Sequence, residues 1–308
     1  MKTTHTYHSL FDHTTLHYSI FDHASAKACV LMIHGLAEHR ARYDALANLI
    51  SSLGYVVITL DQRGHGETGD QTLLGYFSDE DGWMRNIQDI RAIQHHVEQK
   101  YSLNQTILFG HSMGSVVARS LLKHFGDDYI ACVLSGLPTL PPGIGGLKIL
   151  MKLLEMMFGS KTPSKLFYKL SFEAYDKKHH STFKNAWLSV NEENVKGYND
   201  DPWCGFTLTH RGVLDFLDGM QDVIHHKAKD NLFGHKPMWI VVGLKDPSAN
   251  HPKDIEDTLK LLKKQGYTNI TTTIDPFSQH EVFFDVNATT LNHELLTFIQ
   301  DVTHKPKE

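Results

Sequence analysis

A strand, an abrupt turn and a helix follow one another between residues 105 and 124, and a serine stands at the turn. The run Thr106-Ile-Leu-Phe109 is apolar and strand-like, whereas Val116-Val-Ala-Arg-Ser-Leu-Leu122 has the apolar spacing of a helix. Between them lies Gly110-His-Ser112-Met-Gly114, a Gly-x-Ser-x-Gly pattern that raises a serine hydroxyl above the carboxyl edge of a sheet. The pattern predicts that Ser112 is a nucleophile. The alternative is an ordinary β-to-α turn of a parallel sheet.

Continuous apolar runs recur along the chain and predict strands that are covered on both faces. They span residues 28–33, 55–60, 105–109, 129–134 and 237–242, and a further strand is predicted over 268–274. Helical patterns alternate with these runs, which is typical of an α/β fold with a mostly parallel central sheet and helices on both faces. Residues 5–22 alternate loosely between apolar and polar and predict an antiparallel hairpin at the edge of that sheet.

The alternation of strands and helices is interrupted once. A stretch dense in proline and glycine begins at Pro138, and only helical patterns follow it before the strand at 237–242. We therefore expect an α/β core of residues 1–138 and 236–308, with residues 139–235 inserted as a helical cap over the carboxyl edge of the sheet.

The first helical segment of the predicted cap, residues 147–158, is apolar around more than half of its circumference. Three interpretations are open: packing within the cap, the wall of a tunnel for an acyl chain, or transient contact with a membrane or micelle. Its methionines suit the last two, because flexible thioether side chains adapt to varied apolar ligands.

Two residues that follow later strands complete a site around Ser112. A serine hydroxyl needs a base to take its proton, and the base needs a carboxylate to hold its tautomer. Asp246 directly follows the strand at 237–242, and His280 lies in the loop after the strand at 268–274. Carboxyl ends of parallel strands meet at one edge, so these three residues are predicted to converge there as nucleophile, acid and base. Asp275 is a competing acid. However, it lies only five residues before His280, on the last strand, and from there its carboxylate is poorly placed to approach the imidazole.

The transition state of acyl transfer also needs donors for its oxyanion. In this architecture one donor is the backbone N–H after the nucleophile, here Met113, and the other comes from the loop after an early strand. That loop is His34-Gly35-Leu36, and the N–H of Leu36 is the candidate.

Taken together, the motifs resemble those of the monoacylglycerol lipase and lysophospholipase group of α/β-hydrolases, also called serine aminopeptidase-like hydrolases. They are His34-Gly-Leu-Ala-Glu38-His39 followed by Arg42-Tyr43, then Asp61-x-Arg-Gly-His65-Gly66, Gly-His-Ser112-Met-Gly, and the Asp246 and His280 pair. The resemblance covers the two core segments. It implies an α/β-hydrolase fold, with Ser112, Asp246 and His280 catalytic and with the N–H groups of Leu36 and Met113 as oxyanion donors. Two positions depart from the family pattern: Glu67-Thr68-Gly69 replaces a usual serine, and Ser115 replaces a glycine.

Composition excludes several other classes of function. A net charge of −5 without a basic run argues against a nucleic-acid partner. The three cysteines are widely spaced and are expected to be free thiols, and none of the histidine pairs has a third ligand at a recognisable spacing. We therefore expect no metal and no cofactor. The N-terminus lacks the apolar core of a signal peptide and no apolar run reaches 18 residues, so a cytoplasmic protein is expected.

These features predict a serine carboxylic-ester hydrolase that works through an acyl-enzyme intermediate. The expected partner is a small-molecule ester with an acyl chain, such as a monoacylglycerol or lysophospholipid. One alternative is a serine hydrolase for small esters or peptide-type substrates. Another is a ligand-binding relative with vestigial activity, which the presence of nucleophile, acid and base together disfavours. The sequence leaves chain-length preference and oligomeric state open.

Overall fold

Eight strands in the described part of the chain form one sheet, in the order β1-β2-β4-β3-β5-β6-β7-β8. The computed structural model describes residues 1–139, 143–179, 183–249 and 252–304. The strands are β1 Lys2–His8, β2 Thr15–Phe21, β3 Cys29–Ile33, β4 Val56–Leu60, β5 Thr106–His111, β6 Tyr129–Ser135, β7 Met238–Gly243 and β8 Ile270–Asp275.

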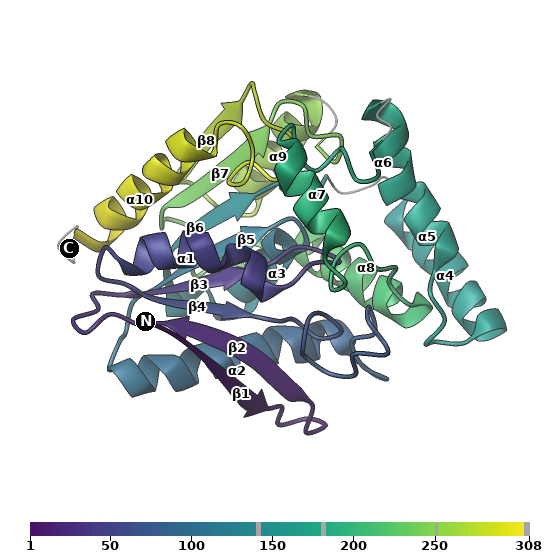
Figure 1. The fold of residues 1–308 in the computed structure, drawn as a ribbon, viewed down its shortest axis with the longest axis horizontal. Helices are drawn as coiled ribbons and strands as arrows, with labels where there is room; N and C mark the ends of the chain where they lie inside the picture. The colour runs from purple at the N-terminus through teal and green to yellow at the C-terminus, as the bar shows by residue number, and fades with distance from the viewer. Residues whose placement is uncertain (140–142, 180–182, 250–251, 305–308) are drawn as a thin grey trace.

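The sheet is parallel from β4 through β8, with β1 and β2 added antiparallel at one edge (Figure 1). The expected α/β class and the edge hairpin are confirmed. The last four parallel strands, β5 to β8, each end one or two residues after the predicted strand end. Polar residues such as His111 and Ser135 therefore still belong to strands.

Two apolar layers hold the sheet between the helices, and successive residues of one strand alternate between them. In β3, Cys29, Leu31 and Ile33 belong to one core cluster, whereas Val30 and Met32 belong to the other. This is the period of two that a strand imposes on its side chains. A strand covered on both faces therefore needs an unbroken apolar run, which explains the sequence pattern.

Helices cover both faces of the sheet. They are α1 Asp44–Ser51, α2 Gly82–Tyr101, α3 Met113–Phe125, α4 Ile144–Phe158, α5 Lys165–Leu170, α6 Phe172–His179, α7 Glu192–Asp200, α8 His210–Ile224, α9 Pro252–Lys264 and α10 Ala288–His304. Buried residues of α2, α3 and α8 belong to the first apolar layer, and those of α1 and α10 to the second.

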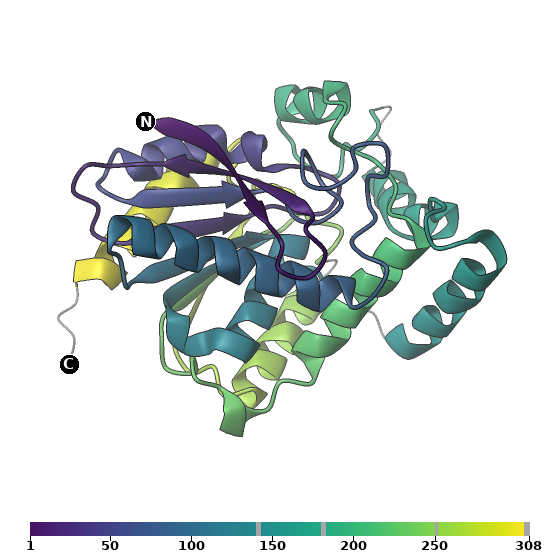
Figure 2. The same cartoon turned by 90° about the horizontal axis from the view of Figure 1, so that it is seen from below.

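Helices α4 to α8 stand between β6 and β7 in the chain, where an inserted cap is expected. Figures 1 and 2 show α4 to α7 gathered beyond the carboxyl ends of the parallel strands. Helix α8 differs, because it packs on α2 and α3 and shares their apolar layer. The division into a core (1–138 and 236–308) and a cap (139–235) stays a prediction, with α8 attached to both, and residues 140–142 of its first boundary lie outside the described residues.

Helix α4 is mostly uncovered. Of its side chains only Met151 is fully buried, whereas Met156, Met157 and Phe158 are 76%, 72% and 58% exposed. Packing within the cap therefore accounts for one face only, and the other two interpretations of this apolar helix remain. Among the described residues, no helix combines the length and the apolar character needed to cross a bilayer.

The contact between α8 and α2 gives a test of the packing. A Cβ added at Gly219 would lie 2.2 Å from the ring of Trp83, whose indole N–H donates to Ser120 Oγ at 3.0 Å. We expect Gly219→Ala to lower the free energy of unfolding by about 1–3 kcal/mol through overpacking. Gly146→Ala is the matched control, because it meets nothing within 4 Å in exposed α4 and should raise stability by about 0.5–1 kcal/mol. Urea unfolding measures both, and a neutral Gly219→Ala would contradict the close packing of α8 on α2.

Candidate active site

Ser112 occupies a strained turn between β5 and α3. Its φ of 53° and ψ of −119° lie outside the usual regions for a residue with a side chain. The turn is possible because its glycines make room: a Cβ at Gly114 would lie 2.2 Å from the carbonyl oxygen of Ile33, and one at Gly110 would lie 2.3 Å from the Gly114 oxygen. The Ser112 N–H donates to the Ser135 oxygen at 2.9 Å, which fixes the turn against β6. The predicted elbow geometry is present.

His280 and Asp246 meet at the same edge. Asp246 follows β7 and His280 follows β8, and His280 Nδ1 lies 2.8 Å from Asp246 Oδ2. Burial alone would lower the pKa of His280, but the Asp246 carboxylate outweighs it and holds that pKa above its usual range. Burial would likewise raise the pKa of Asp246, yet the contact with His280 keeps it below its ordinary value. The pair is therefore poised as an imidazole oriented by a carboxylate.

Ser248 contacts both residues of this pair, and the sequence analysis did not identify it. Its backbone N–H donates to Asp246 Oδ1 at 2.8 Å, and its Oγ lies 3.1 Å from His280 Nδ1. Both contacts orient the pair. The signal was weak, because a serine two residues after an aspartate is a common turn feature.

Asp275, the competing acid, is engaged elsewhere. Its Oδ2 accepts the Ser278 N–H at 2.8 Å and its Oδ1 accepts from Asn287 Nδ2 at 2.7 Å. These bonds shape the loop that presents His280. The contacts therefore favour Asp246 as the partner of His280.

The loop that contains Leu36 is held by buried polar groups. Glu38 Oε1 accepts from the Gly35 N–H at 2.5 Å and from the Tyr43 hydroxyl at 2.9 Å. His34 Nδ1 donates to the Gly35 oxygen at 2.7 Å, and its Nε2 accepts the N–H of Gln62 at 3.0 Å. Burial lowers the pKa of His34 to about 4, so its ring is neutral at neutral pH. These contacts fit a role in fixing the loop.

A guanidinium joins this loop to the histidine loop. Arg42 binds Glu281 through two nitrogens, at 2.6 and 2.8 Å, and binds Glu38 Oε2 at 2.5 Å. Asn194 of α7 contacts both Arg42 and Glu281, at 3.2 and 2.6 Å. Burial would raise the pKa of Glu38, but Arg42 and two nearby histidines lower it to about 2. Glu281 is a second residue that the sequence analysis missed, since its partner lies 239 positions away.

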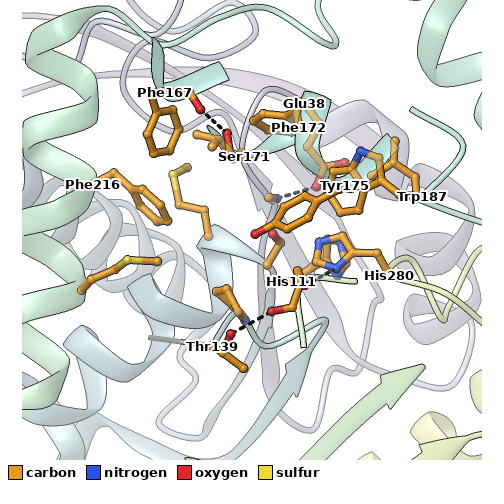
Figure 3. A pocket seen from close by; sticks show the side chains of 18 of the residues that line it. Glu38, His111, Thr139, Phe167, Ser171, Phe172, Tyr175, Trp187, Phe216 and His280 are labelled. Carbon is orange, nitrogen blue, oxygen red and sulfur yellow. Dashed lines mark hydrogen bonds between the residues drawn. The ribbon is translucent and has the colours of Figure 1, made fainter. Parts of the chain in front are cut away.

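A cavity of about 470 Å³ joins these parts. Ser112, His280, Met113 and the loop residues Gly35 and Leu36 line it, so the structure brings the predicted site residues to one pocket, with Asp246 behind His280. The remaining wall is largely apolar and comes from the helices that follow β6 and from the turn before α7 (Figure 3): Leu147, Phe167, Leu170, Phe172, Tyr175, Trp187, Phe216, Leu217 and Met220.

Trp187 lies against the candidate base. Its ring centroid is 4.8 Å from that of His280, and Tyr175 packs on its other side at 4.9 Å. The next residue, Leu188, accepts the Glu281 N–H through its carbonyl oxygen at 2.8 Å. Trp187 thus lines the pocket and is itself buried.

Comparisons with known proteins agree with this architecture. Residues 24–287 match the family described as serine aminopeptidase, S33. A monoacylglycerol lipase of Mycolicibacterium smegmatis is 24% identical over 261 residues, which are 83% of this chain and 82% of that protein. The monoglyceride lipase of Mus musculus is 27% identical over 199 residues, which are 63% of this chain and 56% of that protein.

Solved structures share the fold across nearly the whole chain. A thermostable carboxyl esterase from Bacillus coagulans, in complex with glycerol, superposes with a TM-score of 0.88 at 22% identity and covers 98% of this chain and 99% of its own. The monoacylglycerol lipase of Paleococcus ferrophilus superposes with a TM-score of 0.70 at 21% identity, covering 94% and 99%. At these identities the likeness concerns the fold.

Glu38 provides a test of the buried charge cluster. Its pKa falls on folding from 4.5 to about 2, so its stabilisation is present above pH 4.5 and is lost as the pH falls toward 2. We expect Glu38→Gln to lower the free energy of unfolding at pH 7 by roughly 3 kcal/mol and to flatten its decline between pH 4.5 and 2. Chemical denaturation at several pH values measures this. The exposed Glu294→Gln on α10 is the control, and equal pH profiles for Glu38→Gln and wild type would contradict the assignment.

Proposed function

The chain belongs to the serine aminopeptidase S33 family of α/β-hydrolases and is a carboxylic-ester hydrolase of the monoglyceride lipase type, and from this premise we propose that it cleaves lipid-like monoesters through an acyl-enzyme. The family and fold expected from the motifs are thereby confirmed. The observation that carries the proposal is the shared pocket: Ser112 and His280 lie at its polar end, and an apolar wall extends from them.

The proposed reaction has two halves. Ser112 Oγ attacks the ester carbonyl carbon while His280 Nε2 takes the hydroxyl proton, and Asp246 stabilises the imidazolium through Nδ1. The N–H groups of Leu36 and Met113 donate to the oxyanion. The C–O bond then breaks, and His280 returns the proton to the leaving alcohol. Water attacks the acyl-enzyme in the same way, which releases the carboxylic acid and restores Ser112.

The size and chemistry of the cavity support an acyl-chain substrate. About 470 Å³ falls within the range of roughly 300–1,000 Å³ that is common for ligand pockets. Most of the wall is aromatic or aliphatic, with a few polar residues such as Thr139 and Ser171, so it favours burial of an acyl chain at about 0.8 kcal/mol for each methylene. Relatives named as monoacylglycerol and monoglyceride lipases support the same substrate class.

A small ester is the second candidate. The structural likeness to a carboxyl esterase, with a TM-score of 0.88, supports it. A peptide-type substrate is a related candidate, because the family is named after a serine aminopeptidase. A ligand-binding relative with vestigial chemistry is disfavoured, because Ser112 shares its pocket with His280, whose imidazole is held by Asp246.

We also propose that α4 contacts a membrane or micelle. Its apolar residues Ile149, Leu153, Met156, Met157 and Phe158 are exposed, whereas Leu147 near its start lines the pocket. An exposed apolar surface beside an apolar pocket suits delivery of a lipid from an aggregate.

The function is tested by a p-nitrophenyl ester series. We expect wild-type activity to rise from acetate to medium and long acyl chains, because each buried methylene adds binding energy. Ser112→Ala should lower kcat by roughly 10³-fold or more and abolish stoichiometric labelling by a fluorophosphonate. Unlabelled wild-type protein would overturn the serine mechanism. A maximum at acetate to butyrate would overturn the lipid substrate and leave the mechanism standing.

Contact of α4 with lipid is tested by replacing Met156, Met157 and Phe158 with serine. We expect vesicle binding and hydrolysis of vesicle-borne monoacylglycerol to fall by roughly 100-fold or more, because each of the three side chains contributes about 1–2 kcal/mol on insertion. Hydrolysis of dissolved p-nitrophenyl butyrate should not change. Leu10→Ser with Phe11→Ser is the matched control, since these residues are exposed in the β1–β2 turn. Equal vesicle binding by both variants would contradict the proposal.

A further inference from the structure

Three residues of ligand type meet beside the loop that contains Leu36. The Nε2 of His39, a carboxylate oxygen of Asp201 and the Sγ of Cys204 all lie within 4.8 Å of one another. His39 comes from the loop after β3, whereas Asp201 and Cys204 follow α7. Spacing along the chain did not indicate this cluster, because His39 stands 162 positions before Asp201.

The geometry points to a site in which His39, Asp201 and Cys204 bind one Zn²⁺ ion or a similar divalent transition metal. Imidazole nitrogen, carboxylate oxygen and thiolate sulfur are the three ligand types that Zn²⁺ takes in proteins. Three protein ligands leave a fourth tetrahedral position for water. The ion would tie the segment after α7 to the loop that carries a candidate oxyanion donor.

The distances are close to those that a tetrahedral ion needs. Metal–ligand bonds of about 2.0–2.3 Å place neighbouring ligand atoms roughly 3.4 Å apart. His39 Nε2 and Asp201 Oδ2 lie 2.9 Å apart, and the widest separation in the cluster is 4.8 Å. Shifts of about 1 Å would therefore complete the site, which is within the reach of side-chain rotation.

The backbone already holds the ligands in place without an ion. Asp201 and Cys204 are joined by a turn, in which the Cys204 N–H donates to the Asp201 oxygen at 3.1 Å. Asp201 Oδ1 accepts the Trp203 N–H at 2.8 Å, which leaves Oδ2 directed at His39. On the other side of the site, the Gly205 N–H and the Tyr198 hydroxyl both donate to the Ala37 oxygen, at 2.9 and 2.8 Å.

The surrounding charges favour a cation. Arg42 interacts electrostatically with Asp201 and Cys204, but Glu38 and Glu281 already bind its guanidinium. With Asp201, three carboxylates outnumber this one guanidinium, so the region has a negative balance before any thiolate forms. The side chains of His39 and Asp201 are 13% and 28% exposed, which gives an ion and its water a path to the site.

Binding must displace a proton from the cysteine. Burial raises the pKa of the Cys204 thiol, so at neutral pH the group is protonated and the metal forms its bond to sulfur as the S–H bond breaks and the proton passes to solvent. His39 binds as a neutral imidazole and gives up its contact with Asp201. Affinity should therefore rise with pH.

The experiment is a titration of the EDTA-treated, reduced full-length protein with Co²⁺. We expect one equivalent to produce a near-ultraviolet band from thiolate-to-cobalt charge transfer, which Zn²⁺ then displaces. Cys29 and Cys132 are buried in strands, so this band reports on Cys204. Cys204→Ser should abolish the band, and His39→Gln should weaken binding by at least about ten-fold. Absence of the band in wild-type protein at one equivalent would overturn the site.

Two controls separate this site from other sources of binding. His225→Gln removes an exposed histidine outside the cluster and should leave the titration unchanged. Cys204→Ser should keep the wild-type circular dichroism spectrum and unfolding midpoint in EDTA, which shows that it folds. Equal Co²⁺ affinity in wild type and Cys204→Ser would assign binding to surface histidines and refute the proposal.

Discussion

The contacts of Arg42 hold together the two loops on which the pocket depends. One guanidinium binds Glu38, which fixes the Gly35 N–H, and Glu281, which directly follows His280. Burying such ions is costly, and replacing a whole buried group by apolar residues is often neutral. Removing one partner alone is different, because it leaves a charge without compensation. The cluster therefore fixes the position of the loop that contains Leu36 relative to the loop that contains His280, and through Asn194 it extends to α7.

The parallel sheet explains why these loops meet at all. Strands β3, β5, β7 and β8 end at the same edge, and each delivers one part: the Leu36 loop, Ser112, Asp246 and His280. The strained backbone of Ser112 is tolerated because the strand before it and the helix after it are both anchored in the core. The geometry of the pocket therefore depends on the stability of the sheet.

This division also explains what the sequence could and could not predict. Ser112, Asp246 and His280 were predictable because each lies at or shortly after the end of a predicted strand, and strand ends need no knowledge of distant contacts. The roles of Glu281, Ser248 and Trp187 depend on partners brought near by folding, and no local pattern marks them. The sequence left the surroundings of helix α4 open, because an apolar surface around most of a helix is compatible with burial or with contact to lipid; in the structure only Met151 is fully buried. The cluster of His39, Asp201 and Cys204 was not predicted either, because His39 is far from the other two residues in the sequence.

The contact between Trp187 and His280 ties two parts of the pocket wall beside Ser112 to each other. The segment from Trp187 to Leu188 is joined to the histidine loop by a ring contact and by the bond from the Glu281 N–H. If this segment moved away, the His280 imidazole would lose its ring contact and the loop after it would lose a hydrogen bond. A ligand that enters the pocket without disturbing His280 would therefore pass the side that α4 and α5 line. On that wall Leu147 and Leu170 line the cavity, and Leu170 is itself exposed to solvent.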